Sequence, residues 1–318
     1  NLDELPGLRH WLSMFRHILA NRKDFSGKTY EEAGRPWYEY HQLDPGKIPN
    51  GQTIVEPLIA THCHFVPVHE KRLFDQHGQI AKLASTENPD TMLIAAVANS
   101  SSALFWLKEV CYNRGAGRDE HRDRFEYAGK KVEALPIPKS MGSFVEHLPR
   151  LSHECWRRGK RIRALSMEKV LAKLGEAYND WNSSLAGHVK PDHTVRQEFQ
   201  NTDGLRTVLL EVTTVRNQLR AEMIARQEEI DWLAYQAYEL IDDVPILTDE
   251  TDLSLTRHQR PFCFWMNAEG DFRKAVSLIP DDWSDDKRRV WQDRLEIIRD
   301  NEHVRRIERP VYKRRWDE

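Results

Sequence analysis

One long apolar stripe constrains the fold of this chain more than any other feature of its sequence. Five apolar residues within 205–241 follow one another at spacings of four, three, four and four: Val208, Val212, Val215, Leu219 and Met223. Residues separated by three or four positions lie on the same face of an α-helix. The segment is therefore predicted as one helix of about ten turns, the kind that serves as a spacer or packing strut.

Strand and helix patterns divide the chain near residue 143. Before it, strand-like runs occur at 53–69, 79–83 and 125–137, among aromatic, Pro-rich and Gly-rich stretches. After it, helical patterns take over, beginning with 144–186. The predicted fold class is α+β, with a mixed α/β domain, a long-helix spacer and a helical C-terminal segment. The predicted segments are a helical lead-in and these three parts: 1–27, 28–143, 144–243 and 244–318.

Two helices are predicted between the strand-like runs. Asn88 and Pro89 are typical of an N-cap and a first helical turn, and the apolar run after them predicts a helix to Ala98. Ser102 is a suitable cap for a second helix that ends at Val110.

Composition indicates a soluble cytoplasmic protein. Charged residues make up 31% of the 318 residues, and the mean hydropathy is -0.69. No apolar run approaches the length that spans a bilayer, so no membrane partner is predicted. The four cysteines form no CxxC pair, which argues against a disulfide framework or a zinc cluster. Residues 1–25 carry apolar residues at helical spacing, which predicts a helix continuing from an upstream domain.

A run of basic residues follows the mixed domain, although the net charge is only -3. Residues 156–163 contain five Lys or Arg and no acid. Such a cluster is attracted by the phosphates of duplex DNA. Four of its members are predicted to bind phosphate: Arg157, Arg158, Lys160 and Arg161. The alternative is the outer face of a helix packed on the mixed domain.

The second basic segment is a loop within 114–131. It contains the glycines Gly115 and Gly117 near its start, and acids interleave with its bases, so a solvated charged loop is the alternative to DNA contact. Arginines read base edges in the major groove, whereas lysines commonly contact phosphates. The candidates are Arg114, Arg118 and Arg122 for base readout and Lys130 and Lys131 for phosphate.

The triplet His62-Cys63-His64 has metal-binding residue types but no complete ligand set. In an extended strand, His62 and His64 share one side and Cys63 points away. No carboxylate or further cysteine lies nearby in sequence. A packed strand without a metal is therefore predicted, and His62 and His64 stay candidates for contact with a base edge or a phosphate.

Charged residues of the C-terminal half give weaker signals. Glu228, Glu229 and Asp231 are predicted to form an exposed face of the long helix with its ion pairs, so no catalytic residue is assigned. The basic residues of the tail either touch the DNA backbone or dock onto a domain outside this chain: Arg305, Arg306, Arg309, Lys313, Arg314 and Arg315.

Four stretches together resemble one protein family. They are Trp37–Tyr40 followed by ATHCHF, the block Asn99–Pro138, the segment MIARQEEIDWLAYQAY at 223–238, and the ending ERPVYKRRW at 308–316. With them the chain resembles the C-terminal, target-recognition part of the large adenine-specific DNA methyltransferases of bacterial phage defence. These are the BREX (PglX-like) and DISARM types, which are similar to type IIG restriction-modification enzymes.

The resemblance implies that the full-length enzyme transfers a methyl group from S-adenosylmethionine to N6 of adenine. This part would supply recognition of double-stranded DNA. The family's catalytic domain carries a Gly-rich cofactor loop and an Asn-Pro-Pro-aromatic motif, and this sequence has neither. No catalytic residue and no cofactor are therefore assigned to this chain, and an N-terminal methyltransferase domain is its expected partner.

The alternative function is a protein-interaction module without base reading. The apolar stripe and the basic tail would then dock other phage-defence subunits or a phage inhibitor. A stripe exposed to solvent would favour this alternative, and a stripe buried against 144–186 would disfavour it.

Overall fold

The computed structural model describes most of the chain, in two compact units. The first unit spans 1–49 and 71–73, and the second spans 50–70 and 74–318. The described residues are 2–24, 26–40, 53–70, 72, 74–75, 77–82, 90–115, 120–138, 144–166, 202–247, 253–313 and 316.

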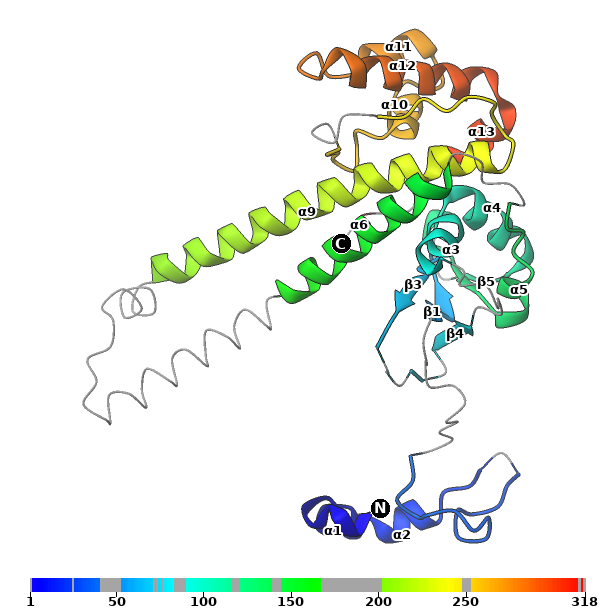
Figure 1. Ribbon diagram of the computed structural model, residues 1–318, viewed down its shortest axis with the longest axis vertical. Coiled ribbons are helices and arrows are strands. Elements are labelled where there is room, and N and C mark those ends of the chain that lie inside the picture. The colour runs from blue at the N-terminus through cyan, green and yellow to red at the C-terminus, as the bar shows by residue number, and fades with distance from the viewer. Residues whose placement is uncertain are drawn as a thin grey trace. The chain divides into compact units, whose positions relative to one another are not determined.

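The first unit contains a short 3-10 turn, Leu2–Glu4, and the helices α1 (Pro6–Ser13) and α2 (Arg16–Ala20) (Figure 1). The single helix predicted for its start is thus two short helices. Tyr30 is fully buried, and the guanidinium of Arg22 lies 4.5 Å from its ring centroid. This cation–π contact stabilises the small unit around the buried Tyr30 ring.

The second unit begins with two small antiparallel sheets. In the first sheet, β1 (Thr53–Pro57) lies between β3 (Val66–Val68) and β4 (Gly78–Lys82). In the second sheet, β6 (Arg124–Glu126) lies between β2 (Ile59–Ala60) and β5 (Tyr112–Gly115). The strand-like runs at 53–69 and 79–83 are confirmed. The run at 125–137 is strand only at its start, because residues after Ala128 form the helix α5 (Gly129–Glu133).

Two apolar helices, α3 (Thr91–Ala98) and α4 (Ser101–Val110), pack on these sheets. The Asp90 carboxylate accepts the amides of Met92 and Leu93, so the predicted cap at Asn88 is wrong; Asn88 itself lies outside the described residues. The Ser100 hydroxyl accepts the amide of Ala103, so the predicted cap at Ser102 is wrong as well. In both cases the residue directly before the helix supplies the cap, and Ser102 already lies within the first turn of α4.

The long helix predicted from the stripe is confirmed as α9, Thr202–Ala237. The helix α6, Phe144–Ala164, lies alongside it in Figure 1. The rest of the helix predicted at 144–186 lies mostly outside the described residues.

At the C-terminal end of the stripe, Met223 lies opposite Gly159 of α6, where a Cβ atom would come within 3.8 Å of the Met223 methyl carbon. Leu219 is buried, and Val212, Val215 and Met223 are half-buried. The Cys155 thiol donates to the carbonyl of Met223 at 3.9 Å.

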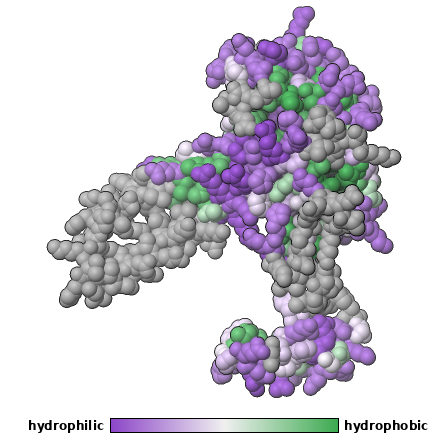
Figure 2. Space-filling model, viewed as in Figure 1, coloured by the Kyte–Doolittle hydropathy of each residue, from purple (hydrophilic) through white to green (hydrophobic). Residues whose placement is uncertain are grey.

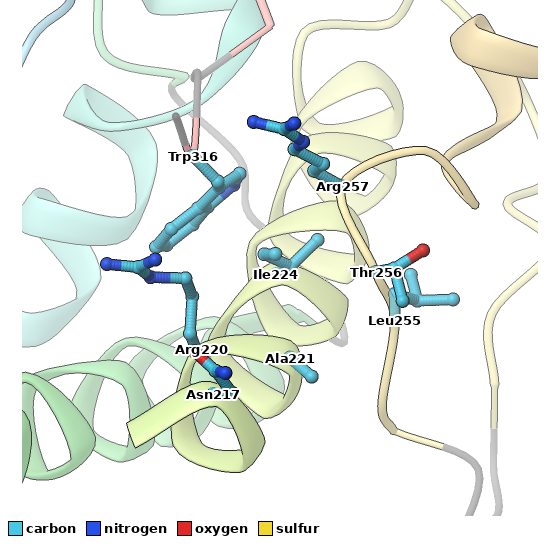
Figure 3. Close-up of a pocket in the computed structure, with 8 residues that line it drawn as sticks. All are labelled: Asn217, Arg220, Ala221, Ile224, Leu255, Thr256, Arg257 and Trp316. Carbon is cyan, nitrogen blue, oxygen red and sulfur yellow. The ribbon is translucent and has the colours of Figure 1, made fainter. Parts of the chain in front are cut away.

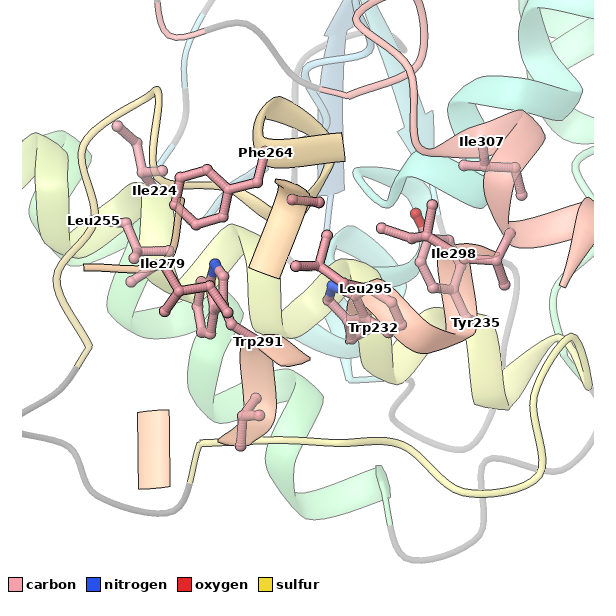
Figure 4. Close-up of a cluster of buried hydrophobic side chains, with 14 of the residues drawn as sticks. Ile224, Trp232, Tyr235, Leu255, Phe264, Ile279, Trp291, Leu295, Ile298 and Ile307 are labelled. Carbon is pink, nitrogen blue, oxygen red and sulfur yellow. The ribbon is translucent and has the colours of Figure 1, made fainter. Parts of the chain in front are cut away.

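Four further helices pack on the C-terminal half of α9. They are α10 (Pro261–Asn267), α11 (Phe272–Ser277), α12 (Asp285–Asp300) and α13 (Glu302–Ile307). Figure 4 shows Trp232 of α9 close to Leu295 of α12 in their common core. The α+β fold class is confirmed. Within the described residues, no helix is long and apolar enough to cross a membrane.

The caps provide a test of the local structure. Ser100 both accepts the amide of Ala103 and donates to the carbonyl of Val97, whereas the Ser102 hydroxyl is buried without a hydrogen-bond partner among the described residues. We expect Ser100→Ala to lower the free energy of unfolding by about 1–2 kcal/mol. Ser102→Ala is expected to change it by less than about 0.5 kcal/mol. Urea titration of both variants measures the difference, and equal losses would contradict the assignment of the cap.

Candidate nucleic-acid interface

Three of the predicted phosphate-binding residues lie on one exposed face of α6. Arg157, Lys160 and Arg161 are spaced by three and four positions, so they share a side of the helix, and all three are exposed. The Lys160 ammonium lies 3.9 Å from the centroid of the Trp156 ring and 3.7 Å from the Glu70 carboxylate. Both partners of this ion pair are more than half exposed, so the pair neutralises little of the charge of Lys160. Figure 2 shows a largely hydrophilic surface in the region of α6.

The fourth predicted residue, Arg158, faces α9 instead. Its Nε donates to Glu222 at 2.6 Å, and its Nη1 lies 3.3 Å from Glu154. Arg226 of α9 also donates to Glu154. Burial acts to raise the pKa of Glu154, but the hydrogen bond and charge of Arg226 outweigh it and lower that pKa. Arg158 therefore ties α6 to α9.

The β5–β6 hairpin and α5 carry the remaining basic candidates. Arg114 pairs with Glu126 on the neighbouring strand and lies 4.9 Å over the ring of Tyr112. Arg122 is exposed at the end of the 3-10 turn Glu120–Arg122. Lys130 and Lys131 are exposed on α5, and Arg118 lies outside the described residues.

The two candidate histidines differ in environment. His62 is 2% exposed, and its Nε2 lies 3.1 Å from the backbone carbonyl of Lys313. His64 is exposed. The prediction that both share one side of a strand is wrong, because β2 ends at Ala60 and the chain bends after it. In the part of the chain that the structure describes, no group of three His, Cys, Asp or Glu is placed to hold a metal ion.

Five charged side chains from three segments meet in the interior of the second unit. We call them the buried charge cluster: Glu228, Asp231, Arg260, Glu308 and Lys313, each at most 2% exposed. The Lys313 ammonium lies 2.9 Å from Glu228 and 2.8 Å from Glu308. It also lies 3.0 Å from Asp231. Arg260 donates from Nε to Glu228 at 2.7 Å.

This cluster overturns the prediction of an exposed acidic face on the long helix. Beyond the stripe, α9 has buried apolar side chains on all sides, including Ile230, Trp232 and Tyr235. A helix that is apolar all round is buried, and a buried carboxylate requires a cationic partner. In the sequence, the change from a one-sided apolar stripe to apolar residues on all sides of the helix indicates that these acids are buried. Lys313, predicted to touch DNA or another domain, is the partner that closes the cluster.

Charge compensation sets the protonation of the cluster. Burial acts to raise the pKa of Glu228, but the charges of Lys313 and Arg260 outweigh it and lower that pKa to about 2. Burial raises the pKa of Glu308, and the Glu228 carboxylate adds to this effect. The Tyr235 hydroxyl donates to Glu308 at 2.6 Å. Since the cluster holds three carboxyls against two cations, a carboxyl with a raised pKa brings it closer to neutrality.

A second buried ion pair joins α9 to α12. Arg294 donates from Nη2 to both carboxylate oxygens of Glu229 at 2.8 Å. It also donates from Nε to the carbonyl of Pro245 at 3.0 Å. Its guanidinium lies 5.1 Å from the ring of Trp232 and 4.9 Å from that of Trp291. These contacts engage Nε and Nη2 of an arginine that is completely buried, whereas its Nη1 has no hydrogen-bond partner among the described residues.

The end of the chain also holds α4. Lys108 on α4 is buried and donates to the carbonyl of Val311 at 2.8 Å, and burial lowers its pKa to about 8. The rings of Phe105 and Tyr312 meet edge to face at 4.9 Å. The charge cluster, α4 and the sheets are thus connected through residues 311–313.

A cavity of about 540 Å³ lies beside α9. Figure 3 shows its wall formed by Arg220 and Ile224 of α9, by Thr256 and Arg257, and by Trp316.

Comparisons with known proteins give two matches. Residues 223–318 match the family model of a domain of unknown function (DUF7008), and this range contains all five members of the buried charge cluster. The chain is 29% identical, over 99% of its length, to a Streptomyces coelicolor protein named adenine-specific methyltransferase PglX. It spans about a quarter, 25%, of the length of that relative. No solved structure matches.

Removing the central cation tests the buried charge cluster. Lys313→Met leaves the buried Glu228 and Asp231 without the ammonium between them. We expect a loss of about 3–5 kcal/mol in the free energy of unfolding, measured by urea titration. The control is Lys274→Met at an exposed position of α11, which should cost less than about 0.5 kcal/mol. A similar small loss at both positions would show that the cluster does not stabilise the fold.

The cluster also predicts an acid-dependent loss of stability. The pKa of Glu228 falls from an ordinary 4.5 to about 2 on folding. Its contribution is therefore complete above pH 4.5 and is lost as the pH falls toward 2. In Glu228→Gln, the free energy of unfolding should depend less steeply on pH within this window. Glu211→Gln, at an exposed position of the same helix, should keep the original slope. Identical slopes in both variants would contradict the lowered pKa.

Proposed function

We propose that this chain is the DNA-recognition part of an S-adenosylmethionine-dependent adenine-N6 methyltransferase of bacterial phage defence. In this proposal it binds double-stranded DNA in the cytoplasm and sets the recognised sequence. The methyltransferase domain that binds the cofactor and performs the transfer is its partner and lies outside this chain.

The similarity to the adenine-specific methyltransferase of Streptomyces coelicolor carries the proposal. It extends over 99% of the chain and covers 25% of the relative. A region of that size accommodates target recognition beside a separate catalytic domain. The four stretches that resemble the BREX and DISARM methyltransferases point to the same role.

In the proposal, the exposed cations of α6 and of the β5–β6 hairpin form the surface that contacts DNA. Arg157, Lys160 and Arg161 project from one face of α6 and would contact DNA phosphates. In the proposal, Arg114 and Arg122 of the β5–β6 hairpin contact base edges. Such a division separates positioning on the backbone from reading of the sequence.

The interaction-module alternative finds less support. In the stripe that would dock a partner, Leu219 is buried, and Val212, Val215 and Met223 are half-buried. Val208 has no described side chain. A covered stripe offers little apolar surface for another subunit.

The test removes the cations of α6. The triple variant Arg157→Ala, Lys160→Ala, Arg161→Ala should bind all duplex sequences more weakly than the unaltered chain. A protein loses about 0.9 from the slope of log affinity against log salt for each phosphate contact removed. We therefore expect the slope to become less negative by roughly 2 to 3, measured by fluorescence anisotropy with labelled duplex DNA.

The matched control removes three cations at exposed positions of α12, with Arg288→Ala, Arg289→Ala and Arg299→Ala. Its affinity and salt slope should match those of the unaltered chain. Equal losses in both triple variants would indicate a response to net charge alone. An unaltered chain that binds no duplex DNA would overturn the proposal.

A further inference from the structure

The helices α1 and α2 of the first unit leave an apolar face exposed. Its members recur every three or four positions, so they lie along one side of the two short helices. Each of these side chains is between 40% and 67% exposed. Figure 2 shows hydrophobic surface, in green, on the first unit near α1. We call this face the N-terminal apolar patch: Leu5, Leu8, Trp11, Phe15 and Ile18.

The patch continues across the break between the two helices. The ring centroids of Trp11 and Phe15 lie 5.2 Å apart, so α1 and α2 present their apolar residues together. The other side of the helices carries the exposed residues His10, Ser13 and His17. The two helices are therefore amphipathic, with the apolar side open.

The packing that these helices need is missing from the first unit. The helix α1 has eight residues and α2 has five. Isolated helices shorter than about 12–15 residues are marginal in water, and in proteins the packing of an apolar side stabilises them. Neither helix has a buried residue, and among the described residues of the first unit only Leu2 and Tyr30 are buried. A surface beyond these residues is needed to cover the patch.

We propose that the N-terminal apolar patch docks onto the methyltransferase domain of the enzyme. This inference rests on the proposed function, which supplies that domain. The chain spans only 25% of the Streptomyces coelicolor relative, so most of that relative has no counterpart among these residues. The phosphates of DNA do not cover an apolar face, whereas an apolar surface of another domain does.

A domain of the same enzyme fits the patch better than a passing partner. Contiguous apolar side chains that stay uncovered promote aggregation. A linked domain is present at a high effective concentration and covers the face continuously. A separate protein covers it only in proportion to its own concentration.

Photo-crosslinking from the patch tests the proposal in the full-length enzyme. Trp11 is 55% exposed, so Trp11→p-benzoylphenylalanine places the crosslinker without disturbing a buried residue. We expect mass spectrometry to find crosslinks to the methyltransferase domain. Adding Leu8→Ser should lower their yield roughly 10-fold, because it removes an apolar contact of the interface. The matched control is Leu278→Ser, at a position 43% exposed after α11, which should leave the yield unchanged.

Several outcomes would overturn the docking surface. They are an absence of crosslinks, equal yields with Leu8→Ser and Leu278→Ser, crosslinks to the rest of this chain, and crosslinks to a second copy, which mixing with isotope-labelled protein reveals. If the enzyme still methylates duplex DNA in any of these cases, the proposed function stands. A full-length protein that neither binds nor methylates duplex DNA would contradict the proposed function, and with it the identity of the partner.

Discussion

The attraction between the Lys313 ammonium and the carboxylates around it holds the second unit together. Its three acidic neighbours come from α9 and from the end of the chain, and none of the groups is in contact with bulk water. Charges removed from water destabilise a fold unless each finds an opposite charge and hydrogen bonds. The tail must therefore return to the middle of the structure, and its course is fixed by electrostatics as much as by apolar packing.

The same return of the tail connects the helical part to the α/β part. His62 and Lys108 contact backbone carbonyls of Lys313 and Val311, so the loop after β2 and the helix α4 are fixed to the charge cluster. On the other side, two ion pairs fix α6 to α9: Arg158 of α6 with Glu222 of α9, and Arg226 of α9 with Glu154 of α6. The exposed cations of α6 thus lie on a helix that ion pairs fix to α9.

Periodic features of the sequence predicted the fold well, whereas contacts between distant segments escaped it. The stripe predicted α9, and strand-like runs predicted β1 and β4, because the local sequence is enough to predict these elements. The exact caps were missed, since several oxygen-bearing residues stood close together. The charge cluster was missed because its partners Glu228 and Lys313 are 85 positions apart in the sequence. The residues next to each of them in the sequence are typical of an exposed charged surface. Arg158 was misassigned for the same reason. Its place in a basic run predicted contact with phosphate, whereas in the structure it pairs with Glu222 of the neighbouring helix.

Because α9 is unbroken, the number of residues between its contacts determines how those contacts are positioned. Its residues 222–233 contact α6, and Glu228 and Asp231 within the same stretch enter the charge cluster, with no break in the helix. One residue added between Glu222 and Glu228 would turn the part of the helix before it against the part after it by about 100° and shift it by about 1.5 Å. Exposed side chains elsewhere on the helix are free to diverge among relatives, but insertions and deletions in this stretch are not tolerated. Relatives of this chain should therefore keep the number of residues here constant while their sequences change.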